Sequence, residues 1–258
     1  MSPKKHLGQH FLSDPYIVEQ IIRSMHIREE DRIVEIGPGQ GALTRQLLKL
    51  CNELYAIEYD ADLIPYLQNK HPNLNLFHQD ALTFDFQQLA TEKKLRIIGN
   101  LPYNISTPLI FHFLKYSEHI VDMTLMLQKE VAERICANPG SKQYGRLTIM
   151  TQYHCSVEKI LDVPDTAFFP PPKVQSAVIR LQPFTQENNP FPNISLEVLS
   201  KIVTEAFSHR RKTLRNALKL FLTDTTLEKL DIDPQARPET LTIAQFISIA
   251  KILQKTDF

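Results

Sequence analysis

Short apolar runs alternate with helical patterns along the first hundred residues of the chain. Four runs have the length of buried strands: 31–36, 54–58, 74–78 and 95–99. The stretch 43–50, which follows the first run, carries apolar residues at helical spacing. Two later runs predict further strands, at 156–163 and 174–181. Alternation of this kind predicts an α/β domain built on a mainly parallel sheet.

The pattern changes after residue 181. Pro183, Pro190 and Pro192 interrupt a polar segment in which no periodicity continues. Helical spacing then returns in 196–207 and in 243–253. We therefore predict a domain boundary near residue 188, with an α/β domain in 1–188 and a small all-helical domain in 189–258.

Glycine is concentrated after the first predicted strand. Three of the seven glycines of the chain, Gly37, Gly39 and Gly41, fall within five positions there. The spacing G-x-G-x-G differs from the dinucleotide motif G-x-G-x-x-G and from the phosphate-binding motif that ends in lysine. No lysine stands where a pyrophosphate or triphosphate would need a counter-charge. This favours an adenosine ligand without phosphates, and S-adenosylmethionine is the obvious candidate.

Acidic residues stand where the next two strands end. Glu58 closes the second predicted strand, and Asp80 with Ala81 follows the third. A carboxylate at Glu58 can accept hydrogen bonds from both ribose hydroxyls and would repel a 2′-phosphate. Asp80 is suited to accept from the adenine amino group. Each acid alone also fits a solvated loop or a helix cap, but their places at successive strand ends favour a cofactor site.

The fourth predicted strand runs directly into Asn100-Leu101-Pro102-Tyr103. This tetrapeptide resembles the motif of methyltransferases that modify amino nitrogens of nucleobases. The adenine amino nitrogen is a poor nucleophile because its lone pair is delocalised into the ring. The Asn100 side-chain oxygen and the Leu101 carbonyl could each accept an amino hydrogen and stabilise the charge developing on nitrogen. Pro102 removes a competing donor, and Tyr103 offers a stacking face. The alternative is an ordinary turn, which the preceding strand and glycine loop disfavour.

Together with the glycine loop, Glu58, Asp80 and this tetrapeptide, two further motifs point to a family. They are Gly8-Gln9-His10-Phe11-Leu12 and the segment 168–176, which reads FFPPPKVQS. Over nearly its whole length the chain resembles the ribosomal RNA adenine N6,N6-dimethyltransferases, above all the bacterial small-subunit enzymes linked to kasugamycin sensitivity. The resemblance implies a Rossmann-like class I methyltransferase sheet with a helical C-terminal domain. It also implies transfer of two methyl groups to each of two adjacent adenines in the 3′-terminal hairpin of 16S rRNA.

The resemblance also assigns the cofactor contacts. The residues it implies, together with those of the glycine loop and the strand ends, are His10, Leu12, Gly37, Gly39, Glu58, Asp80, Ala81 and Asn100. The family more often has asparagine at position 10, and a histidine there cannot reproduce both functions of an amide. A contact made by the His10 side chain is therefore less secure than one made by its backbone, and the alternative is that His10 packs beside Phe11.

Phe168 and Phe169 precede three prolines, which favour a stiff extended loop able to present an aromatic ring. One of the two rings, with Phe169 preferred, is expected to sandwich the flipped-out target adenine against Tyr103. The alternative is that both rings belong to the core. Lys173 is expected to meet a phosphate, and the alternative is that it is simply solvated.

The formal net charge is zero, so the sum of charges does not indicate a nucleic-acid binder. The distribution does, because no acid lies between Glu205 and Asp224 while five cations do: Arg210, Arg211, Lys212, Arg215 and Lys219. If this segment is helical, Arg211, Arg215 and Lys219 share one face, which can bind successive phosphates of an RNA strand. A solvated helix face is the alternative.

The remaining features bound the setting. There is no run of eighteen apolar residues, the N-terminus lacks the apolar core of a signal peptide, and the three cysteines are widely spaced. We expect a cytoplasmic monomer without a metal, acting on 16S rRNA in the immature small subunit. Three rival functions remain: a large-subunit rRNA methyltransferase of the macrolide-resistance type, a DNA adenine methyltransferase, and chiefly a ribosome-assembly checkpoint.

Overall fold

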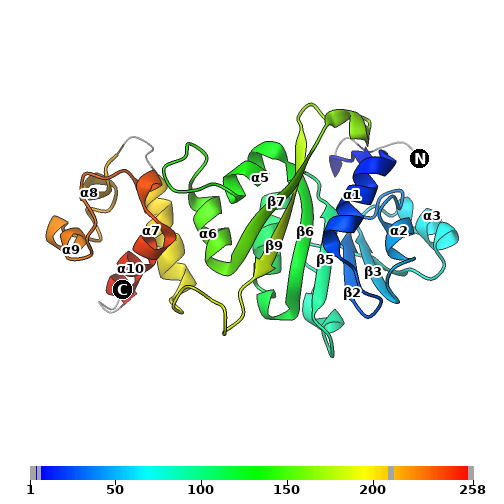
Figure 1. Ribbon diagram of the computed structural model, residues 1–258, viewed down its shortest axis with the longest axis horizontal. Coiled ribbons are helices and arrows are strands. Elements are labelled where there is room, and N and C mark those ends of the chain that lie inside the picture. The colour runs from blue at the N-terminus through cyan, green and yellow to red at the C-terminus, as the bar shows by residue number, and fades with distance from the viewer. Residues whose placement is uncertain (1–3, 5–6, 209–211, 255–258) are drawn as a thin grey trace. The chain divides into compact units, whose positions relative to one another are not determined.

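The computed structural model describes residue 4 and residues 7–208 and 212–254. The chain forms two compact units, Met1–Ala132 with Ser156–Pro183 and Glu133–Cys155 with Phe184–Phe258 (Figure 1). The sequence predicted a single boundary near residue 188. The observed division differs because the segment 133–155 packs with the C-terminal residues, although a stretch of the first unit separates the two in sequence.

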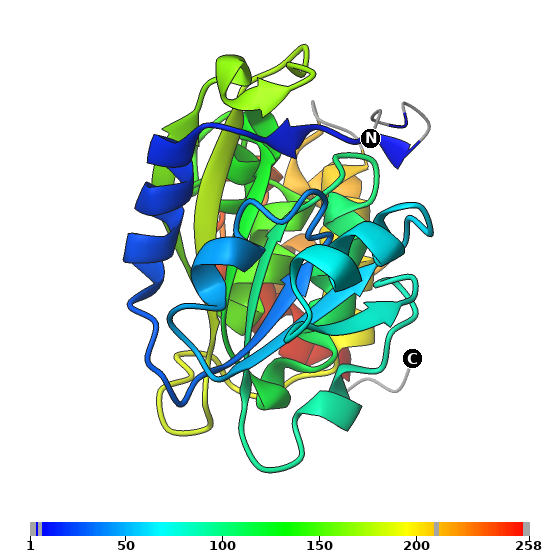
Figure 2. The ribbon, with the colours of Figure 1, turned by 90° about the vertical axis from the view of Figure 1, so that its right-hand side faces the viewer.

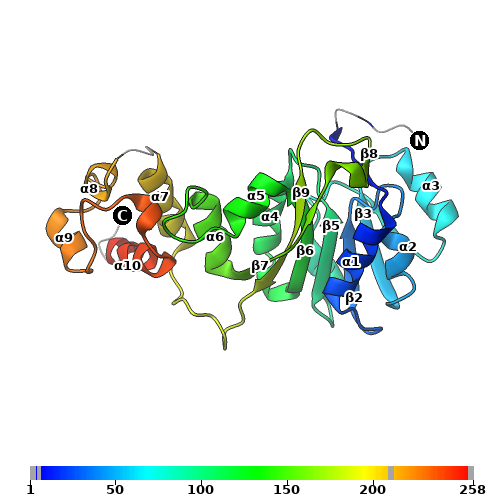
Figure 3. The same cartoon turned by 45° about the horizontal axis from the view of Figure 1, so that its top comes forward.

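A seven-stranded sheet forms the centre of the first unit, in the order β4-β3-β2-β5-β6-β9-β7 (Figure 3). The strands β2 to β6 run parallel, and β9 runs antiparallel to β6. The sheet strands are β2 (Arg32–Ile36), β3 (Glu53–Glu58), β4 (Asn75–His78), β5 (Leu95–Asn100), β6 (Ile120–Gln128), β7 (Cys155–Val163) and β9 (Ser176–Pro183). The predicted α/β fold is confirmed, and every predicted strand matches an observed one to within two residues. β6, which the sequence patterns did not single out, lies between β5 and β9.

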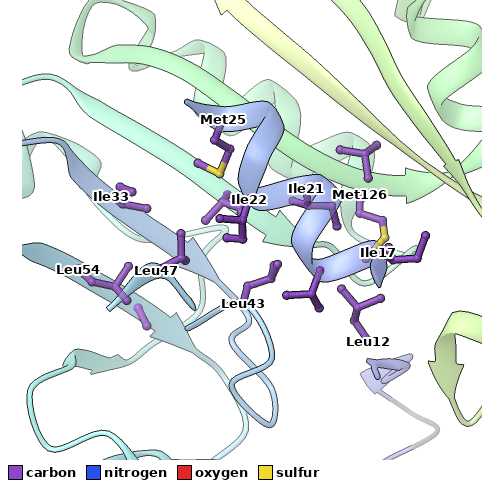
Figure 4. Close-up of a cluster of buried hydrophobic side chains, with 14 of the residues drawn as sticks. Leu12, Ile17, Ile21, Ile22, Met25, Ile33, Leu43, Leu47, Leu54 and Met126 are labelled. Carbon is purple, nitrogen blue, oxygen red and sulfur yellow. The ribbon is translucent and has the colours of Figure 1, made fainter. Parts of the chain in front are cut away.

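Helix α1 (Pro15–Met25) covers one face of this sheet (Figure 4). The Asp14 side chain accepts from the backbone N–H groups of Tyr16 and Ile17, so it caps the helix, and Pro15 occupies the first turn. Apolar residues recur at helical spacing, and five of them are buried: Ile17, Val18, Ile21, Ile22 and Met25. They belong to one cluster with side chains of α2 (Thr44–Leu47) and of six strands of the sheet. Removing each such side chain from water stabilises the packing by about 1.5–3 kcal/mol.

Helix α2 is shorter than the predicted helical stretch 43–50. The N–H groups of Lys49 and Leu50 bond three residues back, to Gln46 and Leu47, which interrupts the four-residue pattern. This tightening turns the chain toward β3, which begins only three residues after Leu50. Helix α2 ends early because the chain must enter β3 at Glu53, and pairing in the sheet outweighs the helical spacing of residues 48–50.

The remaining elements of the first unit pack around this sheet. Rings of Phe84, Phe86 and Phe113 form edge-to-face contacts beside α4, and Leu63 and Leu67 of α3 pack against Phe11. A two-stranded antiparallel sheet joins the N-terminal segment to a late loop, with Phe11 opposite Phe169. These elements are α3 (Leu63–Lys70), α4 (Ser106–Leu114), β1 (Phe11–Leu12), β8 (Phe168–Phe169) and the 3₁₀ turns Phe86–Leu89, Ser117–His119 and Asp165–Ala167.

The second unit is helical. Helix α7 packs against α10 and α6, and the Tyr153 ring of α6 stacks on Phe191 while its hydroxyl accepts from the Ile194 N–H. These contacts explain why residues 133–155 belong here. The elements are α6 (Arg146–His154), α7 (Leu196–Phe207), α8 (Leu214–Ala217), α9 (Asp224–Glu228), the 3₁₀ turn Pro238–Thr240 and α10 (Ile243–Gln254), and α5 (Lys129–Ile135) spans the division.

The predicted basic helix face is not formed as expected. Helix α8 has only four residues, so Lys212 precedes it and Lys219 lies beyond its end. The first N–H groups of α8 bond to backbone carbonyls of Pro234 and Ala236, which fixes its start against a distant loop. Arg210 and Arg211 lie outside the described residues.

Candidate active site

A cavity of about 280 Å³ opens at the carboxyl ends of β2, β3 and β5. β2 pairs with β3 on one side and with β5 on the other, so the chain reverses its winding there, which is where α/β sheets bind ligands. Most predicted site residues line the cavity: His10, Gly37, Gly39, Glu58, Asp80, Ala81, Asn100, Leu101, Pro102 and Tyr103. Leu12 and Phe169 are not among its lining residues. The sequence analysis gave no site role to several residues that do line it, including Leu7, Gln9, Phe11 and Tyr59, although Gln9 and Phe11 belong to the N-terminal motif.

The glycine loop needs glycine for two reasons. Gly37, Gly39 and Gly41 have φ values of 62°, 58° and 79°, which other residues rarely adopt. A Cβ on Gly39 would lie 3.0 Å from the Phe11 ring, and one on Gly41 would lie 2.7 Å from His71 Nε2. The loop therefore lies against the N-terminal segment on one side and against the end of α3 on the other.

Glu58 lies at the end of β3 and is only 6% exposed. Its Oε1 accepts from the Asp60 N–H at 2.8 Å, and its Oε2 accepts from the Gly39 N–H at 3.2 Å. Burial raises the pKa of Glu58, and the backbone hydrogen bonds from Asp60 and Gly39 act against that rise. The carboxylate thus joins the glycine loop to β3 and faces the cavity.

Glu35 is a second buried carboxyl group beneath the loop. It is 1% exposed, and the Thr44 hydroxyl donates to its Oε2 at 2.6 Å. Burial raises the pKa of Glu35 to about 7, the Thr44 hydrogen bond lowers it, and the Glu58 charge raises it further. The sequence patterns gave Glu35 no role beyond its place in the strand 31–36, and the structure makes it a support that holds α2 to the end of β2.

Glu58→Gln is expected to weaken cofactor binding by about 10- to 100-fold, since a hydrogen bond to a charged group contributes about 1.5–3 kcal/mol. The wild-type affinity should fall as the pH drops toward the raised pKa of Glu58, because a protonated carboxyl accepts poorly from a ribose hydroxyl. Calorimetric titration with S-adenosylhomocysteine between pH 5 and 8 measures both effects. An acid-side loss of affinity that persists in Glu58→Gln would assign the pH dependence to another group.

Asp80 follows β4 and lines the cavity. Its Oδ1 accepts from the Leu82 N–H at 2.9 Å, so one oxygen closes a local turn. One oxygen therefore caps a turn, as the alternative interpretation expected, while Oδ2 forms no hydrogen bond with the described residues, and a ligand contact there stays a prediction.

Asn100 ends β5 with a fixed side-chain orientation. Its Nδ2 donates to the backbone carbonyl of His10 at 2.8 Å. A carbonyl oxygen can only accept, so the amide nitrogen must face His10 and Oδ1 must point away from it. The next residue is held as well, because the Leu101 N–H bonds to the carbonyl of Met126 in β6. An acceptor oxygen is thus preorganised at the cavity wall.

Tyr103 is held from two sides. Its hydroxyl forms a 2.6 Å hydrogen bond with Ser176 Oγ at the start of β9, and its ring stacks on His10 with centroids 5.8 Å apart. His10 Nδ1 donates to the Pro170 carbonyl at 2.8 Å. The His10 side chain therefore does more than pack beside Phe11, because it joins Tyr103 to the loop that follows β8.

The two phenylalanines of β8 point in opposite directions, as successive residues of a strand do. Phe168 is 4% exposed and belongs to the core around α1, whereas Phe169 is 63% exposed. Of the two rings, only Phe169 is therefore available to a substrate. Lys173, four residues further on, is exposed.

The described cations of the second unit are also exposed. Lys212 and Lys219 lie at the surface, and Arg215 forms an ion pair with Asp224. Asp224, the acid that ends the acid-free stretch of the sequence, thus neutralises one cation of that stretch, Arg215.

Comparison with known proteins decides the family. A family model described as ribosomal RNA adenine dimethylase matches residues 1–255. The chain belongs to this family. It is an S-adenosylmethionine-dependent rRNA adenine methyltransferase. The glycine loop, Glu58 and Asn100 predicted the cofactor and the methylation of an amino nitrogen, and the family resemblance predicted the rRNA substrate.

Named relatives are similar over nearly the whole chain. The ribosomal RNA small subunit methyltransferase A of Pseudomonas syringae pv. syringae is 50% identical over 256 residues, which cover 98% of this chain and 95% of that protein. The protein of the same name from Vibrio cholerae is 49% identical over 258 residues, covering 98% and 94%.

Solved structures agree on the fold. A dimethyladenosine transferase from Plasmodium falciparum superposes with a TM-score of 0.82 at 28% identity, covering 95% of this chain and 98% of that one. The 23S rRNA methyltransferase ErmE superposes with a TM-score of 0.73 at 24% identity, covering 94% and 99%, which supports the fold alone.

Two further features concern the described part of the chain. Within it, no helix is long and apolar enough to cross a membrane. Over the same residues, no group of three His, Cys, Asp or Glu side chains is arranged to hold a metal ion.

Proposed function

We propose that this enzyme transfers methyl groups from S-adenosylmethionine to N6 of two adjacent adenines in the 3′-terminal hairpin of 16S rRNA, giving dimethyladenosines. The observation that carries the proposal is the fixed amide of Asn100, whose Oδ1 is left free at the cavity wall by the bond from Nδ2 to His10. The choice of the small subunit is supported by relatives at 49–50% identity that bear that name.

The cavity residues fit the cofactor. The buried Glu58 carboxylate suits two ribose hydroxyls, Asp80 Oδ2 suits an adenine amino group, and Gly37 and Gly39 leave the backbone accessible. Lys4 forms ion pairs with Asp60 and Asp62, so its charge does not serve to neutralise a phosphate of the ligand. When bound, S-adenosylmethionine supplies an activated methyl group on a sulfonium.

The protein's own task is to hold the amino nitrogen. Asn100 Oδ1 and the Leu101 carbonyl accept the two amino hydrogens, which frees the nitrogen lone pair and stabilises the charge that develops there. No general base is required before the new bond forms, and the proton leaves the product nitrogen to solvent. Alignment then contributes the remaining acceleration, for which positional effects of about 7–11 kcal/mol are available.

Phe169→Ala is expected to lower methylation of the RNA about 10- to 100-fold, since a base-stacking contact contributes about 1–3 kcal/mol. In this proposal the exposed Phe169 ring stacks on the face of the adenine opposite Tyr103. Its loss should therefore raise the KM for RNA and leave the affinity for the cofactor unchanged. Val174→Ala, which truncates another exposed apolar residue of the same loop, is the matched control. Unchanged turnover of Phe169→Ala on ribosomal particles would remove the sandwich from the proposal.

RNA contacts beyond the base are assigned to the exposed cations. Lys173, Lys212 and Lys219 are free to meet phosphates, Arg215 can exchange its partner Asp224 for one, and the same role is proposed for Arg210 and Arg211. Binding through such contacts weakens as salt rises. The proposed setting is a cytoplasmic monomer acting on the immature small subunit.

The deciding experiment is methyl transfer from labelled S-adenosylmethionine to undermethylated 30S particles, with 50S particles and duplex DNA in parallel. Dimethyladenosine at adjacent adenines of the small-subunit hairpin is the expected product. Label in 50S particles alone would favour the macrolide-resistance type, label in DNA a DNA methyltransferase, and binding without transfer an assembly checkpoint.

A further inference from the structure

Part of the cavity wall is a short segment of turns and irregular backbone that precedes the first strand. Residues 7–10, here called the cover segment, precede β1 and line the cavity together with Phe11. Figure 2 shows the N-terminal chain crossing the end of the sheet before it enters α1. A ligand in the cavity is therefore enclosed on this side by a segment whose position depends on side-chain contacts.

Those contacts converge on Asp60, two residues after Glu58. Gln9 Nε2 donates to Asp60 Oδ2 at 2.7 Å, and Lys4 Nζ donates to Asp60 Oδ1 at 2.5 Å. The Gln9 Oε1 also accepts from the Lys4 backbone N–H at 2.8 Å. A single amide side chain thus joins the cover segment both to Lys4 and to the Asp60 carboxylate.

Asp60 is a buried carboxylate whose two oxygens accept the hydrogen bonds from Gln9 and Lys4. It is 4% exposed, and its Oδ1 also accepts from the Asp62 N–H at 3.1 Å. Burial alone would raise the pKa of Asp60, but the hydrogen bonds from Lys4 and Gln9 outweigh it and hold that pKa below its ordinary value. The carboxylate therefore remains charged, and a buried charge is stable only while its partners stay in place.

The backbone of Asp60 also holds the side chain of Glu58 in place. The Asp60 N–H donates to Glu58 Oε1 at 2.8 Å, so the residue that anchors the cover segment also orients the proposed ribose acceptor. The far end of the segment reaches the catalytic residues, because the His10 carbonyl accepts from Asn100.

We propose that Asp60 is a positioning residue and that its bonds with Gln9 and Lys4 form a latch, which holds the cover segment over the cofactor. The inference rests on the proposed function in one respect: a second methyl transfer to the same nitrogen needs a fresh cofactor, so the cavity must open between transfers. The Lys4 side chain is 31% exposed although Asp60 is buried, so water can reach the ammonium group when the pair opens. Gly8, with φ at 64°, supplies backbone freedom within the segment.

The test measures release of S-adenosylhomocysteine without RNA, by filter binding after dilution into excess unlabelled ligand. Gln9→Glu places a carboxylate against Asp60 and is expected to accelerate release about tenfold or more at pH 7.5. Lys4→Ala should accelerate it severalfold and abolish the dependence of the release rate on salt. Hydrogen exchange of the amides of residues 7–10 should rise in both variants, while exchange of the amides of β2 and β5 stays at the wild-type rate.

Lys93→Ala is the matched control, because it removes an exposed ion pair with Glu53 at the opposite end of β3. Its release rate should equal that of the wild type. Release and amide exchange in Gln9→Glu and Lys4→Ala that match this control would overturn the latch. Because these readings contain no RNA, failure of the latch and failure of the proposed methyl transfer are told apart.

Discussion

Asn100→Ala is expected to lower the rate of methyl transfer at saturating cofactor about 10²- to 10³-fold. Loss of one preorganised electrostatic partner of a transition state has a cost of about 2.7–4 kcal/mol. The alanine variant loses Oδ1 at the cavity wall and also releases the His10 carbonyl, to which Nδ2 donates at 2.8 Å. Asn100→Asp should be impaired similarly, because a carboxylate cannot donate to that carbonyl. Single-turnover transfer to undermethylated 30S particles measures the effect.

A second asparagine provides the control. Asn75 Nδ2 donates to the Leu54 carbonyl at 3.1 Å, a bond of the same type made at the start of β4, away from the cavity. Asn75→Ala should therefore reproduce the loss of stability without the loss of rate. Equal rates in the two alanine variants would show that Asn100 is only a structural link.

Asp122→Ala is expected to lower the free energy of unfolding by about 3–5 kcal/mol, since it leaves a buried charge without its main partner. Arg96 of β5 and Asp122 of β6 are paired in register, and the guanidinium donates to both carboxylate oxygens, at 2.9 and 2.6 Å. Burial lowers the pKa of Arg96, but its bonds with Asp122 and Asp31 more than reverse this, so it stays charged. The same guanidinium reaches the Met25 carbonyl at the end of α1.

Urea denaturation measures the loss. Asp162→Ala, which removes an exposed partner of Lys159 and Lys129, should lower the free energy of unfolding by less than about 1 kcal/mol. A joint replacement of Arg96 and Asp122 by Met and Leu should recover part of the stability, because neither member of the buried pair is then left alone, while Asp31 still loses its bond from Arg96. The expectation fails if Asp122→Ala has no larger effect than Asp162→Ala.

Local chemistry made much of this protein predictable. The strands at 31–36, 54–58 and 95–99 follow from apolar runs, and α7 was predicted at the residues it occupies. The three clustered glycines were predicted to shape the backbone, and all three have positive φ. The acid and amide groups at strand ends were expected to meet, because the carboxyl ends of parallel strands share one edge of a sheet. Glu58, Asp80 and Asn100 do line one cavity.

Contacts between segments distant in sequence could not be predicted in this way. Gly99 is required because a Cβ there would lie 3.0 Å from the Ile36 carbonyl, a clash between strands that sequence spacing does not encode. The small β1–β8 sheet buries Phe168 and exposes Phe169, a choice that depends on register and not on composition.

The sequence by itself determined the fold class, the position of the glycine loop and that of the tetrapeptide 100–103 at the cavity wall, because these depend on short-range periodicity and on residue chemistry at strand ends. Only the tertiary structure decided how the site is closed and how the chain divides. The bonds of Gln9 and Lys4 to Asp60 span more than fifty residues, and residues 133–155 join the C-terminal unit by packing against segments far along the chain. The physical reason is the same in each case: burial and hydrogen-bond satisfaction are properties of the assembled chain, and no local pattern records which distant partner meets them.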